Sequence, residues 1–519
     1  MFKKVISAFL VICVLFSLIG CKGNGGTQSG TEYNSPSKII TLEEYHSRIK
    51  GLLEYENFST ADDKYFKTLE ELGTDLENMI MYSTNDVTEC EGTKYYVSNN
   101  GDDNADGKTP ETAWATLDKV NSINFKEGDL VVFERGGLWR GHIAAKSGVT
   151  YSAYGEGLKP KIYSSLDGIA YADWVETDTP NVWKLDKKIF NSDIGVLVFD
   201  GVDKDALYAE KKSSLKAVKK DLDFAFCGSY IPEGKTDNYL YLYSEEGNPA
   251  KRFSSIEVSL KEVNVTTVNG THDVLVNNLD LKFGIKPFDL AYCNNIAFTY
   301  CINGWQGGHF QNKGDVRAGG GGYAMPDSDN TTVDSCIIYQ QFDSGVTPQV
   351  AWETKGKVAV IENFIVKNCL FDYCEYTLEY FNTQPDNTEN CFKGLYFGYN
   401  FCRTGGYGFG TKPGKSAYIK SWGHENTCYD SVFEYNIFDR ALSNTLEVIS
   451  YKQLENGKRE ISYELMPTLR NNVYIQEDNK RFGDIADKTY RYKKSDLEKY
   501  LATGIDKGSV FMFAPKTED

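Results

Sequence analysis

The residues best suited to chemistry in this sequence are carboxylates that stand among aromatic side chains in its second half. Asp343 lies in the stretch QQFDSGVTPQ, and Glu379 lies in CEYTLEYFN, next to Tyr376 and Tyr380. Two carboxyl groups that flank a glycosidic bond can hydrolyse it, one as acid or base and the other as nucleophile or base. Aromatic neighbours exclude water from Glu379 and favour its protonated form, which suits a general acid.

These carboxylates come together if the chain winds as stacked strands. Aligning the strands on the central apolar residues Phe310, Val346, Leu378, Phe409 and Leu446 puts the following residues on one face: Gln311, Thr347, Glu379, Gly410 and Glu447. Asp343 precedes the strand next to Glu379, so the two could approach to about 5–6 Å, as in a retaining glycosidase. Glu447 lies two coils from Glu379, about 10 Å away, near the separation of an inverting pair. We predict Glu379 as acid/base, Asp343 as the second carboxylate and Glu447 as a reserve.

Aromatic and basic residues in the neighbouring loops are candidates for holding a sugar. Aromatic rings can stack on sugar rings, and Arg or His side chains can bind their hydroxyl groups. The candidates for substrate binding are Trp305, His309, Arg317, Trp352, Tyr376, Tyr380, Tyr407, Trp422 and His424. An ordinary packed or solvated role remains an alternative for each of them.

A lyase and a binding protein remain alternatives to a hydrolase. Arg403 and Lys412 could supply the base and the charge neutralisation that a lyase needs at a uronate. A non-catalytic glycan-binding or adhesive protein would use the same aromatic surface without the carboxylates.

Neither a metal nor another cofactor is expected. The loop Asp102-x-Asn104-x-Asp106-Gly107 matches the first half of an EF-hand, but Ala113 stands where the bidentate Glu is required. The cysteines form no CxxC pair and no Cys/His cluster with zinc spacing. Ten of the twelve cysteines follow Cys21, and whether they pair stays open.

A recurring signature provides the elements that would position the carboxylates. From residue 271 onward, an Asn or Cys repeatedly stands between apolar residues, and by subtraction these positions lie 23 to 36 residues apart. They are Asn278, Cys301, Cys336, Cys369, Asn400, Asn436 and Asn472. Periods of about 20–50 residues indicate stacked repeats, in which small apolar or amide side chains fill one interior slot.

An earlier stretch carries a family resemblance. Its features are Tyr-Val-Ser at 96–98, a Gly/Asp/Asn loop at 101–107, Pro110, Trp-Ala-Thr-Leu at 114–117 and Gly-Asp-Leu-Val at 128–131. Together they resemble the right-handed parallel β-helix proteins of the pectate-lyase-like superfold. Residues 165–262 resemble the β-sandwich that β-helix xylosidases insert into the solenoid. The resemblance implies a carbohydrate-active protein, with a glycoside hydrolase acting on an extended polysaccharide favoured.

The expected fold class is all-β: a right-handed parallel β-helix with an inserted β-sandwich and an N-terminal helical hairpin. The expected segments are 1–20 as a lipoprotein signal peptide, 21–40 as a flexible tether, 41–90 as the helical hairpin, 93–164 as the N-terminal cap and first coils, 165–262 as the sandwich, 263–480 as the β-helix core and 481–519 as the C-terminal cap.

Composition and targeting bound the possible partners. The 519 residues are 41% hydrophobic and 25% charged, which is typical of a globular protein. The net charge of −17 argues against a nucleic-acid partner. Lys3 and Lys4 precede an apolar run that ends at Cys21 and resembles a bacterial lipobox. We therefore expect a monomer that is lipid-anchored through Cys21 on the extracytoplasmic face of a bacterial membrane and binds a polysaccharide or oligosaccharide.

Overall fold

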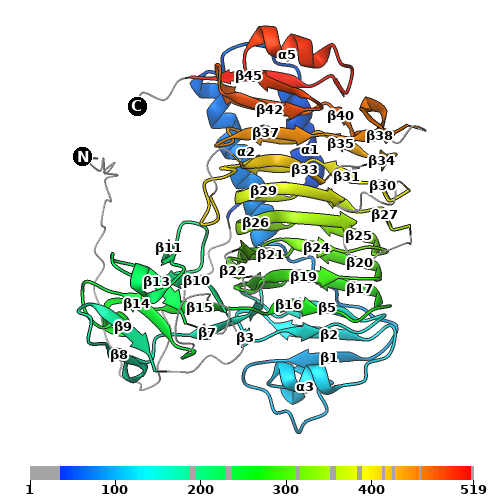
Figure 1. The fold of residues 1–519 in the computed structure, drawn as a ribbon. Coiled ribbons are helices and arrows are strands. Elements are labelled where there is room, and N and C mark those ends of the chain that lie inside the picture. Colours follow the sequence, from blue (N-terminus) through cyan, green and yellow to red (C-terminus); the bar gives the residue numbers. More distant parts are fainter. Residues whose placement is uncertain are drawn as a thin grey trace. The chain divides into compact units, whose positions relative to one another are not determined.

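The computed structural model describes residues 36–186, 193–227, 237–310, 316–350, 358–382, 389–411, 415–423, 427–454 and 458–515. Most of this chain winds into coils of short parallel strands (Figure 1). Each coil contributes strands to three faces, and its neighbours pair with it in register. In the part that the structure describes, no helix is both long and apolar enough to cross a membrane.

The first face is an eleven-stranded sheet in which each coil adds one strand in sequence order. Its strands are β1 (Lys94–Val97), β2 (Leu130–Glu134), β5 (Thr150–Tyr154), β17 (His272–Asn277), β20 (Asn294–Thr299), β25 (Asp329–Asp334), β28 (Ile365–Lys367), β31 (Tyr396–Gly398), β35 (Val432–Glu434), β40 (Thr468–Arg470) and β44 (Asp506–Lys507). All pairings within this sheet are parallel.

The second face follows a sharp turn and carries an outer apolar surface. Its strands are β3 (Leu138–Arg140), β6 (Lys161–Tyr163), β18 (Asp280–Lys282), β21 (Ile302–Gln306), the first halves of β26 (Ile337–Val350) and β29 (Leu370–Asn382), β32 (Phe401–Arg403), β36 (Ile437–Asp439), β41 (Val473–Glu477) and β45 (Val510–Ala514).

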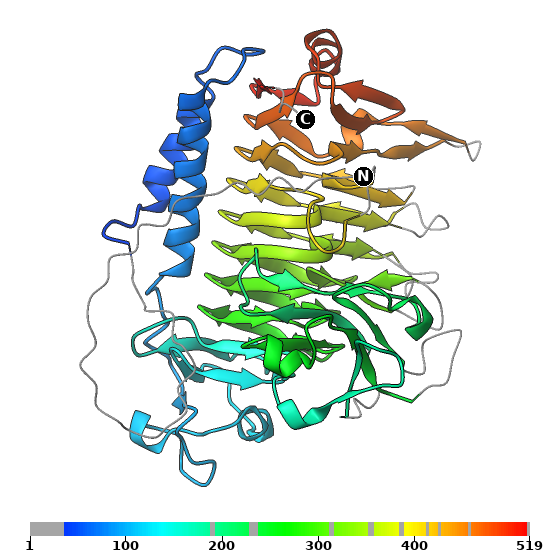
Figure 2. The same ribbon diagram turned by 90° about the vertical axis from the view of Figure 1, so that its left-hand side faces the viewer.

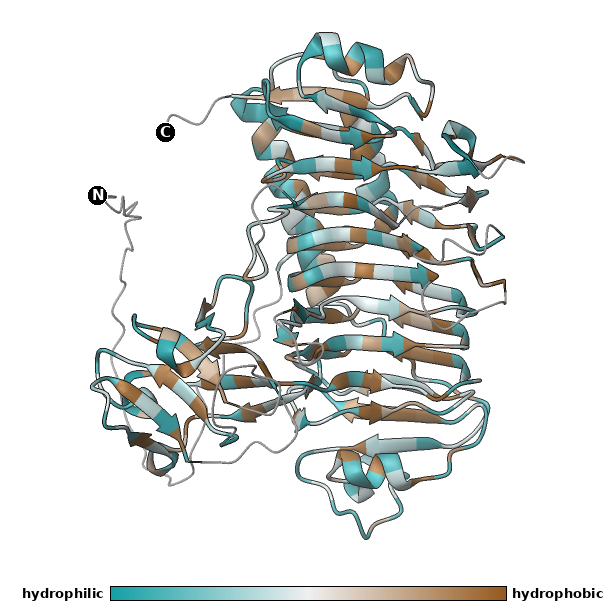
Figure 3. Ribbon diagram, viewed as in Figure 1, coloured by the Kyte–Doolittle hydropathy of each residue, from teal (hydrophilic) through white to brown (hydrophobic). Residues whose placement is uncertain are grey.

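The third face, which we call the polar face, completes each coil. Its strands are β4 (Ile143–Ala144), β16 (Val263–Thr266), β19 (Lys286–Leu290), β24 (Gly322–Ala324), the second halves of β26 and β29, β33 (Ala417–Gly423), β37 (Asn444–Val448) and β42 (Arg481–Ile485). The hydropathy colours alternate along many of these strands, as expected where alternate side chains face the interior (Figure 3).

The turn between the first and second faces is built from one left-handed residue per coil. Seven stacked residues have φ between 53° and 57°: Asn278, Tyr300, Ser335, Asn368, Tyr399, Tyr435 and Asn471. The next residue in each coil points inward and is fully buried: Leu279, Cys301, Cys336, Cys369, Asn400, Asn436 and Asn472. The repeat signature is therefore wrong by one residue in its first coil, because Asn278 occupies the turn and Leu279 the interior slot.

The interior asparagines form a hydrogen-bonded stack. The backbone N–H of Asn400 donates to Oδ1 of Asn436 at 3.0 Å, and that of Asn436 donates to Oδ1 of Asn472 at 3.0 Å. In the preceding coils a thiol takes this place, since the N–H of Cys336 donates to Sγ of Cys369 at 3.4 Å. All ten cysteines in the described ranges are free thiols, so the amides and thiols in this column satisfy backbone groups without disulfides.

Two helices cover the outer surface of the second face (Figure 2). Helix α1 (Leu42–Leu52) begins at a capping box formed by Thr41 and Glu44, and α2 (Asp63–Met81) is capped by Asp62. Their buried residues pack against an aliphatic and aromatic column of the coil: Ile302, Ile337, Leu370, Phe401, Ile437, Val473 and Val510.

The insertion interrupts the coil between β6 and β16. It contains a four-stranded sheet, β7 (Ser165–Asp167), β10 (Ile194–Phe199), β11 (Leu207–Tyr208) and β15 (Ile256–Leu260), and a five-stranded sheet, β8 (Trp174–Glu176), β9 (Val182–Leu185), β12 (Glu210–Lys211), β13 (Asp223–Phe226) and β14 (Leu240–Tyr243). The two sheets share a hydrophobic core. The expected fold class, a right-handed parallel β-helix with an inserted sandwich and a helical hairpin, is therefore confirmed, whereas the segment boundaries stay predictions.

One loop of the insertion is tied to the coil and to α2. The backbone carbonyls of Val202, Asp203 and Lys204 accept hydrogen bonds from side chains of two adjacent coils, with donor–acceptor distances of 2.5, 3.0 and 2.7 Å. The donors are Tyr339, Trp305 and Gln340. Lys204 also forms an ion pair with Glu77 of α2 at 2.9 Å. This loop fixes the insertion to the second face and its helical cover.

The acidic loop at 101–107 has a structural role. Asp103 accepts hydrogen bonds from the backbone N–H groups of Ala115 and Thr116, just before α3 (Leu117–Ser122), and from the Thr116 hydroxyl. Asp106 accepts a hydrogen bond from the Thr112 hydroxyl at 2.7 Å. Among the described residues no His/Cys/Asp/Glu group with metal-binding geometry occurs.

The remaining elements lie outside the three faces and the two sheets of the insertion. They are α4 (Pro249–Arg252), α5 (Lys494–Leu501), β22 (His309–Phe310), β23 (Arg317–Ala318), β27 (Val360–Glu362), β30 (Cys391–Lys393), β34 (Cys428–Tyr429), β38 (Tyr451–Gln453), β39 (Arg459–Ile461) and β43 (Lys488–Arg491).

Candidate active site

Strand register brings one polar residue from each coil into a single column on the polar face. The column runs Asp289, Tyr323, Thr347, Glu379, Lys420, Glu447 and Asp484. Its ends are open, since the side chains of Asp289 and Asp484 are 38% and 39% exposed, whereas Glu379 at its centre is 7% exposed. A carboxylate at the centre is therefore largely removed from water.

The predicted alignment is partly reproduced by this column. Thr347, Glu379 and Glu447 share the face, as the sequence pattern predicts. The position between the two glutamates belongs to Lys420 and not to Gly410, because Ile419 and not Phe409 pairs with Leu378. Gln311, the other residue of the predicted alignment, lies outside the described residues.

Two hydroxyl groups orient Glu379. The Ser344 hydroxyl donates to Oε2 of Glu379 at 3.4 Å, and the Thr347 hydroxyl donates to the same oxygen at 3.3 Å. Both donors lie on β26, the strand adjacent to Glu379. The carboxyl group is therefore positioned by the neighbouring coil.

The charges of Asp343 and Glu379 raise the pKa of the same two phenols, those of Tyr323 and Tyr376. Burial raises the pKa of Tyr323 well above its usual value, and the charges of Asp343 and Glu379 raise it further. Burial likewise raises the pKa of Tyr376, with Asp343, Glu375 and Glu379 adding to the effect. Both phenols thus stay protonated near neutral pH, and they place the two predicted catalytic carboxylates in one electrostatic neighbourhood.

Lys420 separates Glu379 from Glu447. Its ammonium group forms an ion pair with Glu447 and lies 5.9 Å from the ring centroid of Tyr376. Burial lowers the pKa of Lys420, while the charges of Glu379 and Asp484 oppose this shift. In an inverting pair, water occupies the gap between the carboxylates. Here Lys420 stands in that gap, which favours Asp343 over Glu447 as the partner of Glu379.

Two of the predicted sugar-stacking residues are wrong because their rings are buried. Trp305 is fully buried, and its Nε1–H donates to the carbonyl of Asp203. Tyr380 is also fully buried, and its ring packs against Phe392 and Phe433. Neither ring can receive a sugar.

Tyr376 and Tyr407 differ in their exposure. Tyr376 is 3% exposed and contributes a phenol near the carboxylates. Tyr407 is 53% exposed, so its ring is available to a ligand.

His309 and Arg317 belong to the joint between insertion and coil. His309 is fully buried, and burial lowers its pKa to about 3, so it is neutral and does not face a ligand. The predicted sugar contact of His309 is therefore wrong. Arg317 Nε donates to the carbonyl of Gly308 at 2.9 Å, and its guanidinium lies over the ring of Phe342. A buried ion pair of 2.6 Å, Lys211 with Asp193, stands beside them.

Of the other residues that the sequence suggested, Arg403 has a structural role and the side chains of the rest lie outside the described residues. Arg403 forms ion pairs with Asp372 at 2.8 Å and with Glu77 at 3.0 Å, so it fastens α2 to the coil. Trp352, His424, Lys412, Cys21 and the side chain of Trp422 lie outside the described residues.

The sequence analysis missed Lys420 and Tyr323. The stretch from Tyr418 to Trp422 is rich in aromatic and β-branched residues. This composition is a strand signal that could have placed β33 correctly. The Gly-rich stretch before Tyr323 concealed the short strand β24.

No protein-family model matches this sequence, and no curated protein matches it. Solved structures with a similar fold include XylC in complex with xylose, at 10% identity and a TM-score of 0.40 over 81% of this chain and 83% of that one. Others are a glycoside hydrolase, at 9% and 0.41 over 82% and 97%, and an exopolygalacturonase from Thermotoga maritima, at 13% and 0.32 over 80% and 97%. These low values carry no argument about substrate or reaction. The class that strand order and register themselves define is a parallel β-helix protein with a polar column on one face.

Proposed function

We propose that this chain is a carbohydrate-active enzyme, a glycoside hydrolase that binds an extended polysaccharide along the polar column. The observation that supports this most directly is that the charges of Asp343 and Glu379 both raise the pKa of the phenols of Tyr323 and Tyr376. Glycosidic hydrolysis requires two carboxyl groups near the scissile bond, and here Glu379 is buried while Asp343 is partly exposed.

The proposed roles follow from the local contacts. Glu379 protonates the leaving-group oxygen and afterwards activates water, because the hydroxyls of Ser344 and Thr347 fix its orientation. Asp343 acts as the second carboxylate on the opposite side of the scissile bond. Lys420 binds Glu447 and brings a positive charge close to Glu379, which keeps neighbouring carboxylates from repelling one another.

A glycan panel tests this proposal. We expect the wild-type chain to release new reducing ends from at least one neutral polysaccharide, and Glu379→Gln and Asp343→Asn to lose that activity. Tyr429→Phe, at an exposed tyrosine of β34, serves as the matched control and should retain full activity. Full activity in both carboxylate variants would falsify the site.

A polysaccharide lyase is the second candidate, because burial lowers the pKa of Lys420 beside Glu379 and Tyr376. An amine that has lost its proton is a base that can abstract the proton next to a uronate carboxylate. Ultraviolet absorbance from an unsaturated uronate product, lost in Lys420→Met, would favour this reaction over hydrolysis.

A binding or adhesive role is the third candidate. Glycan binding that persists in Glu379→Gln, with no product from any member of the panel, would establish that role. The exposed ring of Tyr407 would then be a natural contact for the sugar.

We further propose attachment to the bacterial cell membrane through a lipid on Cys21, with the coil on the extracytoplasmic side. The apolar run that ends at Cys21 supports this proposal. Cys21→Ser should abolish incorporation of a labelled fatty acid and release the chain from membranes. Retained labelling in that variant would contradict the anchor.

A further inference from the structure

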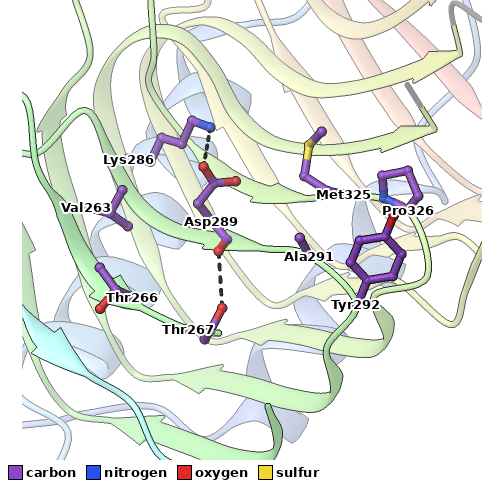
Figure 4. A pocket seen from close by; sticks show the side chains of 9 residues that line it. All are labelled: Val263, Thr266, Thr267, Lys286, Asp289, Ala291, Tyr292, Met325 and Pro326. Atoms are coloured by element: carbon purple, nitrogen blue, oxygen red, sulfur yellow. Dashed lines mark hydrogen bonds and ion pairs between the residues drawn. The ribbon is translucent and has the colours of Figure 1, made fainter. Parts of the chain in front are cut away.

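A pocket of about 370 Å³ lies on the polar face, away from Glu379 (Figure 4). It is formed by β16, β19 and the turns that follow β19 and β24. Its lining includes Thr266, Thr267, Lys286, Asp289, Tyr292 and Pro326.

The pocket stands in line with the proposed catalytic pair. Asp289 pairs with Tyr323, Tyr323 pairs with Thr347, and Thr347 lies beside Glu379 on the next strand. Three strand spacings separate Asp289 from Glu379, which amounts to about 14 Å. An oligosaccharide that extends along the column from Glu379 reaches the pocket.

The chemistry of the pocket suits an uncharged polar ligand. Lys286 Nζ lies 2.7 Å from Asp289 Oδ2, so the two charges neutralise each other while keeping donors and an acceptor for hydroxyl groups. The same ammonium lies 3.7 Å from the ring centroid of Tyr323, which fixes its position. A lone lysine would attract a uronate, whereas this ion pair gives no net attraction for a carboxylate.

One wall supplies a ring and the other supplies polar groups. Tyr292 is 38% exposed and lies beside Pro326, across the pocket from Lys286 and Asp289 (Figure 4). Thr266 and Thr267 lie at the base of this view, where the Thr267 hydroxyl donates to the Asp289 carbonyl at 3.3 Å. An apolar ring face opposite convergent hydrogen-bonding groups is an arrangement that binds small polar ligands.

We propose that this pocket is a distal subsite for a neutral sugar residue of the polysaccharide that is cleaved at Asp343 and Glu379. The inference rests on the proposed function for its substrate class. It adds that the chain recognises its substrate several residues away from the scissile bond, and that the residue held there is uncharged.

The test measures oligosaccharide affinity by calorimetry in a Glu379→Gln background, from disaccharide to octasaccharide. The probes are xylo-, cello- and manno-oligosaccharides as neutral series and oligogalacturonates as the charged series. Tyr292→Asn removes the ring at a position with φ of 53°, which asparagine tolerates. We expect it to weaken binding of the longest neutral ligand by about tenfold and to leave the disaccharide unchanged.

Two further variants make the result specific. Tyr429→Asn removes an exposed tyrosine from β34, outside the pocket, and should change neither affinity. Asp289→Asn leaves Lys286 without its neutralising partner, so affinity for oligogalacturonates should rise relative to the neutral series. Equal weakening of short and long ligands by Tyr292→Asn, no weakening of long ligands, or a preference of the parent chain for oligogalacturonates would each overturn the subsite.

Failure of the subsite and failure of the proposed reaction remain distinguishable. If Glu379→Gln hydrolyses the panel as fast as wild type while Tyr292→Asn loses long-ligand affinity, the subsite is supported and the catalytic assignment is overturned. If Glu379→Gln is inactive while Tyr292→Asn binds every length normally, the subsite is overturned and the catalytic assignment is supported.

Discussion

Strands β26 and β29 each present two different outer surfaces. Their first halves carry Ile337 and Leu370, which belong to the apolar column under α1 and α2. Their second halves carry Thr347 and Glu379, which belong to the polar column. The same backbone pairing therefore supports a covered apolar face and an uncovered polar face within one strand.

The comparison shows what in-register stacking does to side chains. A parallel coil places equivalent residues next to one another, so an aliphatic residue in every coil becomes a continuous strip that a helix can cover. At the centre of the polar column Lys420 lies between Glu379 and Glu447, so unlike charges are neighbours there. Residue choice at one position per coil decides the role of a whole face.

The largest expected effect is a loss of activity when the carboxylates at the centre of the polar face are substituted. We expect Glu379→Gln and Asp343→Asn each to lower kcat by about 10²–10⁴-fold, the usual contribution of a positioned acid or base. Because the two groups act as a unit, the double variant should be little slower than the slower single variant. Steady-state kinetics on the active glycan measures this, and fully additive losses would contradict a shared role.

The second prediction concerns stability, and it substitutes a residue of the covered face on the strand that carries Glu379. Leu370 is fully buried, so Leu370→Ala should lower the free energy of unfolding by about 2–5 kcal/mol. Denaturant titration measures this, while kcat of the folded fraction should stay unchanged. Leu207→Ala, at a leucine that is 47% exposed, is the control and should change stability by less than about 0.5 kcal/mol. A kcat lost together with stability would mean that the two faces are coupled.

A smaller loss of stability is expected at the interior column that leads into the covered face. Asn436→Ala removes the acceptor of the Asn400 N–H and should cost about 1–3 kcal/mol. Asn436→Cys should cost less, because Cys369 already accepts the equivalent N–H in another coil. Thermal unfolding of both variants measures the difference. Equal losses would show that volume, and not hydrogen bonding, sets the choice at this slot.

The fourth prediction concerns two lysines that differ in burial. Lys420 lies among carboxylates, whereas Lys159 is 3% exposed and its pKa falls to about 7 through burial, with the Arg135 charge lowering it further. Between about pH 7 and pH 8.5 the unfolded chain holds this proton more tightly than the folded chain. The free energy of unfolding should therefore rise with pH, by at most about 1.4 kcal/mol per pH unit.

Lys159→Met provides the measurement of that contribution. Its free energy of unfolding should lose this rise across the same pH range. At higher pH the buried thiols of Cys301 and Cys336 act in the opposite direction, because their raised pKa keeps them protonated only in the folded chain. An identical pH slope in wild type and Lys159→Met would contradict the assignment.

The fold could be predicted because one residue per coil is constrained by two stacked neighbours. Interior Asn and Cys residues recur for that reason, and the signature located every coil from Cys301 to Asn472. It misplaced Asn278 because asparagine is favoured both in the interior slot and at the left-handed turn. Sequence alone does not separate these two preferences.

The site could be predicted only where the coils keep one length. Glu379 and Glu447 aligned correctly, but the longer connection between β32 and β33 moved Lys420 into the place assigned to Gly410. Phe409, taken for a strand residue, packs against Phe342 and Trp305. The burial of Trp305 could not be foreseen, since the carbonyl that covers it comes from Asp203, far away in the chain.

The loop formed by residues 202–205 has a consequence for motion. Its carbonyls at Val202, Asp203 and Lys204 are held by two coils, through β21 and β26, and the Lys204 side chain is held by α2 as well. Rotation of the sandwich about this loop would have to break all these bonds together. Thermal motion alone therefore does not move the sandwich over the polar face. We expect the indole N–H of Trp305 to exchange with solvent only when several coils open at once, which makes it a reporter of cooperative unfolding.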